Sequence, residues 1–343
     1  MGADSILRIV AWGIAFFGLV LVVSAFVTRV LVRRAEVAYP PSDRSVVVDG
    51  VRLRYFEKGS GRPVILIHGL RGSSYDFAVS IIGRLARHCR VIAFDRPGHG
   101  YSDAPVNEVH TLSCEAQLLH AASDLLRLKR PLLVGYSLGA AVAMAYGDAY
   151  PEDVAGVVTI SGHVLPFRVP VGLLARLAKR PWIGGVSSNT LVIPIGHLVG
   201  RSLLRRACSP RPVPPWYSRL ALAMALRPRT FRYAPAELGQ SGDDLRELAA
   251  RYGSLPVPVT VVGGCHDAIV SFSQAERFHR RLATSTLVAV PDGGHALHVT
   301  HPDEVVAAVV TALGSTDARR AETREAEMRT GALVDRERQA VCS

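Results

Sequence analysis

The chain has 343 residues, 49% of them hydrophobic and 20% charged, and a formal net charge of +11. This is an ordinary globular composition, with enough chain to bury a core as one large domain or two smaller ones. The five cysteines are scattered and form no C-x-x-C pair. The sequence therefore predicts free thiols in a reducing compartment, and neither a disulfide framework nor a structural zinc site.

The first forty residues contain a long apolar segment, with no charged residue between Arg8 and Arg29. A helix of about 20 residues spans the roughly 30 Å hydrocarbon core of a bilayer. The run is longer than the apolar region of a cleaved signal peptide, and no A-x-A site follows it promptly. Residues 1–40 are therefore predicted to be a permanent membrane anchor, with the short, stiff linker Tyr39-Pro40-Pro41-Ser42 after it.

The charges that flank the apolar segment predict its orientation. Arg29, Arg33 and Arg34 follow the segment, whereas Arg8 and the terminal amine, offset by Asp4, precede it. The flank richer in Lys and Arg stays in the cytoplasm, so the remainder of the chain is predicted to be cytoplasmic. The free cysteines agree with this orientation.

From Val46 onward, short apolar runs rich in β-branched residues alternate with helical patterns. Strands are predicted over 46–48, 52–56, 64–67, 90–94, 132–134, 155–160, 259–262 and 286–290, with Asp49-Gly50 as a hairpin turn. Helices are predicted over 74–87, 113–128, 138–150, 272–282 and 302–313. This alternation is typical of an α/β fold, with a mostly parallel sheet covered by helices on both faces.

Two stretches depart from this alternation. Residues 162–252 hold many prolines and no convincing strand, with helical patterns at 172–179 and 216–226. This stretch is too long for a connecting loop, so a helical lid is predicted there. It divides the core into two parts, 46–161 and 253–314. Residues 315–343 are dense in charge and poor in aromatics, which predicts a disordered tail.

The predicted lid is strongly basic. Between His163 and Ala236 there is no Asp or Glu, whereas Arg and Lys recur throughout. Such a surface suits nucleic acid or an anionic membrane. No zinc-finger spacing, RNP-type motif or KH loop accompanies it, so membrane lipids are the predicted partner and nucleic acid is not. A solvated basic face without a partner is the alternative.

A candidate nucleophile lies in Gly135-Tyr136-Ser137-Leu138-Gly139, between an apolar strand and an alanine-rich helix. A nucleophilic serine needs a sharp strand-to-helix turn, which exposes its oxygen and places the helix N-terminus beneath the developing anion. Gly135 and Gly139 leave room where a Cβ would clash. Ser137 is therefore predicted to be the nucleophile.

An oxyanion formed by attack of Ser137 needs two preorganised N–H donors. The backbone amides of Leu138, directly after the serine, and of Leu70, in the loop after the strand at 64–67, are the candidates. His68 lies in the same loop. We interpret it as a histidine that holds backbone groups in place and does no chemistry.

His295 follows Gly293-Gly294, just after the last predicted strand. A loop there lets the imidazole reach a serine on a central strand and act as general base. His298 and His301 are alternatives. The glycines before His295, and its position nearest the strand end, favour it.

Asp267 ends the glycine-rich segment Gly263-Gly264-Cys265-His266-Asp267, which also follows a strand. A buried carboxylate there would orient the imidazole and stabilise its charged form. Asp95 and Asp292 are alternatives, but each is interpreted as structuring its own turn. The order Ser137, Asp267, His295 matches the arrangement of α/β-hydrolases.

Taken together, residues 46–313 resemble the α/β-hydrolase superfamily. The resemblance rests on five motifs in order, which are His68-Gly69, Asp95-Arg96-Pro97-Gly98-His99-Gly100-Tyr101-Ser102, Gly135-Tyr136-Ser137-Leu138-Gly139, Asp267 and Gly294-His295. It implies an eight-stranded sheet with a lid inserted after the sixth strand. It also implies catalysis without a metal or an organic cofactor.

A serine at position 137 departs from the haloalkane dehalogenases and epoxide hydrolases of this fold, which have Asp there. Hydrolysis of a carboxylic ester is therefore predicted, with C–C bond hydrolysis and cofactor-free haloperoxidation as alternatives that would use the same residues. A non-catalytic binding protein is the alternative from another class. The anchor and the basic lid resemble the layout of membrane-anchored monoacylglycerol lipases, which implies a small hydrophobic or lipid-like ester as substrate.

Overall fold

The computed structural model describes residues 3–105, 111–166, 181–190 and 192–316. Its centre is an eight-stranded sheet in the order β1-β2-β4-β3-β5-β6-β7-β8. The strands are β1 Ser45–Val48, β2 Val51–Lys58, β3 Pro63–Ile67, β4 Arg90–Phe94, β5 Leu132–Tyr136, β6 Gly156–Ile160, β7 Val259–Gly264 and β8 Ser285–Val290. The strand β2 pairs antiparallel with both β1 and β4. All other neighbours in this order, β4-β3-β5-β6-β7-β8, pair in parallel. The predicted fold class and strand number are confirmed.

Helices cover both faces of the sheet because successive strand residues point to opposite sides. Ile65 and Ile67 of β3 belong to the core cluster that includes α4 (Leu112–Leu125) and α5 (Leu138–Ala149). Val64 and Leu66 belong to the cluster on the other face, with α2 (Tyr75–Ala78), α3 (Ile82–Leu85), α12 (Leu297–Thr300) and the helical residues 302–316. The remaining short elements are η1 Pro151–Asp153, η2 Tyr252–Ser254 and α11 Phe272–His279.

The single helix predicted over 74–87 is wrong, because α2 and α3 are separate one-turn helices. The break lies at Ser80. Its hydroxyl donates to the carbonyl oxygen of Asp76, and its backbone amide donates to Phe77 instead. A serine side chain that competes in this way weakens a helical ladder.

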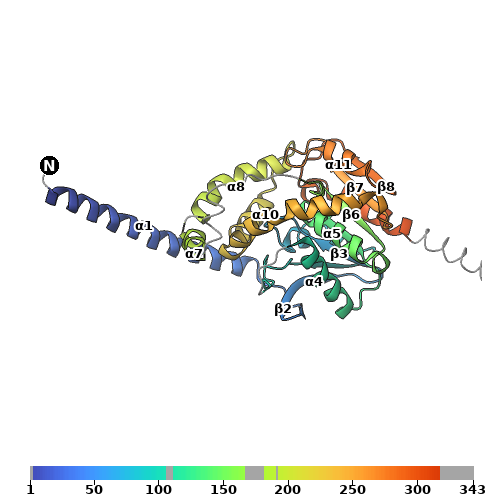
Figure 1. Cartoon of the computed structure of the whole chain (residues 1–343), viewed down its shortest axis with the longest axis horizontal. Coiled ribbons are helices and arrows are strands. Elements are labelled where there is room, and N and C mark those ends of the chain that lie inside the picture. The colour runs from blue at the N-terminus through green and yellow to red at the C-terminus, as the bar shows by residue number, and fades with distance from the viewer. Residues whose placement is uncertain (1–2, 106–110, 167–180, 191, 317–343) are drawn as a thin grey trace, which may run out of the picture.

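Four described helices lie between β6 and β7. They are α7 Pro181–Thr190, α8 Val192–Cys208, α9 Pro215–Ala225 and α10 Pro228–Arg251. These helices pack against one another, with α7 on α8 and α10, and α9 on α8 (Figure 1). The helical pattern predicted at 172–179 lies outside the described residues, as does the tail beyond residue 316.

The N-terminal helix α1 (Ala3–Ala38) projects from the globular body, with α7 beside its C-terminal end (Figure 1). The segment Asp4–Ala38 has a mean hydropathy of 2.5 in its most apolar window, none of which is buried, and it is a candidate membrane span. Near its C-terminal end, Thr28 and Ala35 are buried, and Leu31 and Val32 pack against lid residues. The helix is therefore divided into an uncovered apolar part and a part packed on the lid.

The connection after α1 is bound to the body rather than free. The hydroxyl of Tyr75 donates to the Pro40 carbonyl at 2.6 Å, and that of Ser42 donates to the Tyr55 carbonyl at 2.6 Å. The hydroxyl of Tyr101 donates to the Tyr39 carbonyl. These contacts fix the direction of α1 relative to the sheet.

Candidate active site

Ser137 lies at the turn between β5 and α5 with φ 51° and ψ −119°. A non-glycine residue rarely adopts this region, and such strain is typical of a serine exposed on a sharp turn. A Cβ on Gly139 would lie 2.2 Å from the carbonyl oxygen of Ile67, and one on Gly135 would lie 2.4 Å from the Ala140 Cα. Both glycines therefore allow the close backbone approach that the turn requires.

The three predicted side chains form a continuous chain of hydrogen bonds. The Oγ of Ser137 is 3.0 Å from Nε2 of His295, and Nδ1 of His295 is 2.7 Å from Oδ2 of Asp267. His295 and Asp267 are buried, at 4% and 7% exposure. The other oxygen of Asp267 accepts the N–H groups of Ile269 at 2.7 Å and Val270 at 2.8 Å. The loop thus aims one carboxylate oxygen at the imidazole.

The alternative histidines lie elsewhere. His301 is 3.0 Å from the exposed carboxylate of Asp292. His298 is fully buried among Phe77, Tyr136 and Tyr217, and neither ring nitrogen has a hydrogen-bond partner among the described residues. Burial and the proximity of His295 lower the pKa of His298 to about 3, so its ring is neutral at pH 7.

The two alternative carboxylates, Asp95 and Asp292, also have hydrogen-bond partners other than His295. Asp95 accepts from the amide and hydroxyl of Ser74, both at 2.7 Å, and from the amide of Tyr101 at 2.8 Å. Asp292 accepts from Arg211 as well as contacting His301. Asp95 thus links its own turn, at Tyr101, to the loop at Ser74. Asp292 instead pairs with two side chains outside its turn, Arg211 and His301.

The loop that carries Leu70 is held against the serine. A Cβ on Gly69 would lie 3.0 Å from Cβ of Ser137. In the same loop, Nε2 of buried His68 accepts the Arg96 amide at 3.0 Å, and its Nδ1 lies 2.8 Å from the Gly69 carbonyl oxygen. His68 thus joins two loops through its ring nitrogens. Burial lowers the pKa of His68 well below its ordinary value, and the positive charge of Arg96 lowers it further.

A buried ionic cluster beneath this loop was not predicted. Arg96 is fully buried and pairs with Glu115 of α4, at 2.8 Å, and with Glu237 of α10. It also donates to the His68 carbonyl at 3.2 Å. Burial favours the neutral acid, but Arg96 and His99 lower the pKa of Glu237 to about 2. The only sequence signal was an arginine in a motif that follows a buried strand.

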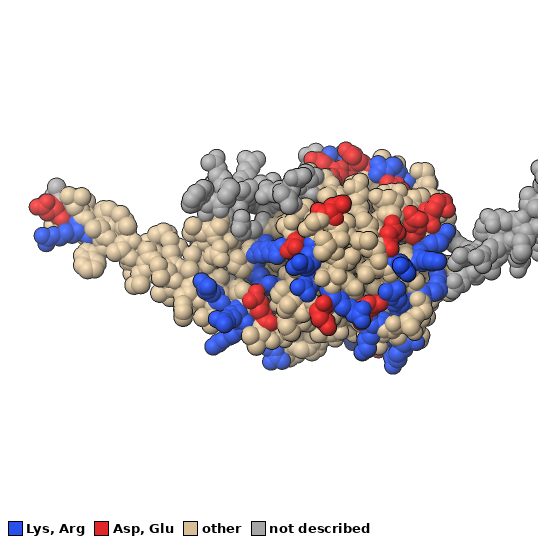
Figure 2. Space-filling view, turned by 90° about the horizontal axis from the view of Figure 1, so that it is seen from below, with Lys and Arg blue, Asp and Glu red and all other residues tan. Residues whose placement is uncertain are grey.

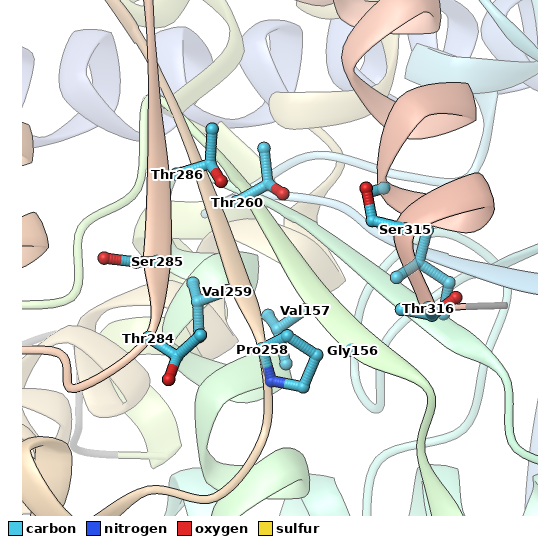
Figure 3. A pocket seen from close by; sticks show the side chains of 12 residues that line it. Gly156, Val157, Pro258, Val259, Thr260, Thr284, Ser285, Thr286, Ser315 and Thr316 are labelled. Atoms are coloured by element: carbon cyan, nitrogen blue, oxygen red, sulfur yellow. The ribbon is translucent and has the colours of Figure 1, made fainter. Parts of the chain in front are cut away.

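A separate pocket lies at the opposite edge of the sheet, where β5 to β8 begin (Figure 3). Residues of these strand starts and of the helical segment 302–316 line it, among them Thr284, Thr286, Ser315 and Thr316. Ser137, Asp267 and His295 all follow the carboxyl ends of their strands. The pocket in Figure 3 is therefore no part of the candidate site.

The fold and this arrangement define a member of the hydrolase class of α/β proteins. The model of the alpha/beta hydrolase family matches residues 64–308, and the chain belongs to that family. The match contains all seven residues predicted for the site.

The relatives differ in the reactions for which they are named. A putative non-heme chloroperoxidase of Synechocystis sp. is 27% identical over 77% of this chain and 94% of its own length. A 2-hydroxy-6-oxo-2,4-heptadienoate hydrolase of Pseudomonas putida is 27% identical over 75% of this chain and 90% of its own. A solved bacterial membrane phospholipase A has a TM-score of 0.62 and 20% identity, with 92% of this chain and 99% of that chain covered.

Proposed function

We propose that the chain is a serine hydrolase that cleaves carboxylic esters through an acyl-enzyme intermediate. The observation that carries this proposal is the contact of Ser137 Oγ with His295 Nε2 at 3.0 Å, with Asp267 on the other side of the imidazole. This is the geometry that lets an imidazole take a hydroxyl proton as the oxygen attacks a carbonyl carbon.

In this mechanism, Ser137 attacks the ester carbonyl while its proton moves to His295. The backbone amides of Leu70 and Leu138 hold the resulting oxyanion. Neither amide donates to another described residue in a loop or turn. His295 then returns the proton to the departing alcohol, which leaves the acyl group on Ser137. A water molecule, deprotonated by the same imidazole, releases the acid, so no cofactor or metal enters the reaction.

Labelling with a fluorophosphonate probe tests the proposal. The full-length chain is expected to be labelled at Ser137, and Ser137→Ala is expected to lose both labelling and hydrolysis of p-nitrophenyl esters, with kcat at least about 10³-fold lower. Ser254→Ala, at an exposed serine, is the second serine control for the mass assignment. Labelling of Ser137→Ala equal to that of the parent would contradict the proposal.

C–C bond hydrolysis is the second candidate, because it is an alternative within this fold and one of the relatives is named as a hydrolase of a dienoate. It would use the same serine, histidine and aspartate. A panel that contains p-nitrophenyl esters and a ring-cleavage dienoate separates the two. Faster turnover of the dienoate than of every ester would replace ester hydrolysis by C–C hydrolysis. The same panel with peroxide and halide tests the haloperoxidase reaction.

A hydrophobic or lipid-like ester is the proposed substrate, and α1 the proposed anchor, with the body on the cytoplasmic side. No charged residue lies between Arg8 and Arg29 of α1, and Figure 2 shows a tan, uncharged stretch behind the charged tip of the projecting helix. Val186 of α7 and Val199 and Leu203 of α8 are about half exposed, at 53%, 50% and 49%. Because α7 and α8 pack beside α1, these side chains lie where the body would meet the bilayer. The solved phospholipase A supports the proposal by analogy.

Leu203→Glu tests the membrane contact, with Leu125→Glu on α4 as a matched exposed leucine. Loss of about half the burial energy of a leucine is roughly 1 kcal/mol, so Leu203→Glu is expected to slow hydrolysis of a long-chain monoacylglycerol in proteoliposomes about fivefold. Hydrolysis of soluble p-nitrophenyl acetate is expected to stay unchanged. Equal effects of both variants on both substrates would contradict lipid contact by the lid.

A further inference from the structure

The C-terminal turn of α8 contacts the loop that carries Asp267. The guanidinium of Arg206 donates twice to the carbonyl oxygen of Ala268, from Nη2 at 2.8 Å and from Nε at 3.2 Å. Ala268 directly follows Asp267, so the peptide that sets the direction of the carboxylate is held from the lid. An arginine fork restrains a carbonyl better than a single donor does, because two bonds fix its orientation.

The same turn also contacts the loop that carries His295. The Ala207 carbonyl accepts the backbone N–H groups of His295 at 2.8 Å and Ala296 at 2.9 Å. A Cβ on Gly294 would lie 2.1 Å from the carbonyl oxygen of Ser209, so the chain after α8 rests directly on this loop. The two loops touch as well, since a Cβ on Gly264 would lie 2.3 Å from the Gly294 carbonyl oxygen.

The helix α8 is in turn joined to the N-terminal helix through α9. A Cβ on Gly196 would lie 2.2 Å from a Leu226 methyl, and one on Gly200 would lie 2.5 Å from a Leu222 methyl. The two helices are therefore in close contact along one face of α8. Leu31 and Val32 of α1, together with Leu204 of α8, pack against the same two leucines.

We propose that Arg206 is a positioning residue for the Asp267–His295 pair, and that α8 and α9 connect the placement of α1 to that pair. The proposal rests on the proposed function, because it concerns the general base of that reaction. Displacement of a reacting group by about 1 Å can cost on the order of 100-fold in rate. The packed path from α1 runs through Leu31 and Leu204 to the C-terminal turn of α8, where the Ala207 carbonyl binds the His295 loop.

Kinetics on soluble p-nitrophenyl acetate test the role of Arg206 in the full-length chain. Arg206→Ala is expected to lower kcat roughly tenfold with KM nearly unchanged. Arg206→Lys, which retains one donor, is expected to recover part of the loss. Arg205→Ala is the matched control, since this neighbouring arginine is exposed and makes no side-chain hydrogen bond to the described residues. Unchanged kcat in Arg206→Ala overturns the positioning role.

A second readout does not depend on turnover. The proton shared by His295 Nδ1 and Asp267 is expected to give a low-field proton NMR resonance, assigned by its loss in Asp267→Asn. Arg206→Ala is expected to shift it, and Arg205→Ala is not. If Arg206→Ala shifts the resonance but fluorophosphonate does not label Ser137 in the parent chain, the proposed function is overturned and the positioning role is not. An unmoved resonance with unchanged kcat would overturn the positioning alone.

The link to α1 is tested with the same resonance. Leu31→Ala is expected to shift it in the full-length chain, whereas Val37→Ala, at a side chain 79% exposed, is expected to leave it in place. A thermal unfolding midpoint measured for each variant identifies any that is not folded, and Val32→Ala then serves as the second variant. No shift in either folded variant overturns the link and leaves the role of Arg206 standing.

Discussion

Asp267→Asn is expected to lower kcat for ester hydrolysis about 10⁴-fold while the fold is retained. The carboxylate oxygen Oδ1 accepts two backbone N–H groups, from Ile269 and Val270, and only an oxygen satisfies them. In the variant, the amide oxygen therefore takes that place and the NH₂ group faces His295. Nδ1 must then accept, which leaves the proton on Nε2 opposite Ser137. An imidazole in this tautomer cannot take the serine proton.

Asp292→Asn is the matched control, because this exposed carboxylate lies three residues before His295 and contacts Arg211 and His301. We expect its kcat to stay within about twofold of the parent, as for most surface changes. Steady-state kinetics on p-nitrophenyl butyrate, with circular dichroism for the fold, measure both variants. If Asp267→Asn retains more than a tenth of the parental kcat, another group orients the imidazole.

The positions of Ser137, Asp267 and His295 could be predicted from sequence because each follows the end of a strand within a glycine-rich turn. The carboxyl ends of parallel strands lie at one edge of the sheet, so residues far apart in the chain converge there. The glycine-rich turns and the order of the strands are enough to place these three residues. The same reasoning identified the strands, since fully buried runs of β-branched residues have few other structures available.

The contributions of the lid could not be predicted in this way. Glu237 and Arg206 lie on α10 and α8, and their partners are fixed by how those helices pack, which no short-range pattern encodes. The basic lid was interpreted as a surface, yet Arg206 and Arg227 bind carbonyl oxygens of the core. The one-turn helices at 75–85 were missed for a different reason. The helical pattern continues through Ser80, and the break there depends on the hydrogen bond from its hydroxyl to the Asp76 carbonyl.

Arg96→Met is expected to destabilise the protein by about 3–5 kcal/mol, because it removes the buried guanidinium that pairs with the carboxylates of Glu115 and Glu237. Arg96 and Glu237 have no exposed side-chain surface, and Glu115 has 2%. For a domain of this size, such a loss lowers the thermal unfolding midpoint by on the order of 10 °C. Differential scanning calorimetry of the full-length chain in detergent measures it.

The comparison that isolates the buried charge is Arg84→Met, which removes an arginine from an exposed pair with Asp303. Exposed pairs contribute about 0–1 kcal/mol, so its midpoint is expected to stay within roughly 2–4 °C of the parent. Arg96→Met combined with Glu115→Met and Glu237→Met is expected to recover most of the loss, since no buried charge is then unpaired. If Arg96→Met unfolds at the parental temperature, the cluster does not hold α4 and α10 together. If the triple variant is no more stable than the single one, the loss comes from packing rather than from unpaired carboxylates.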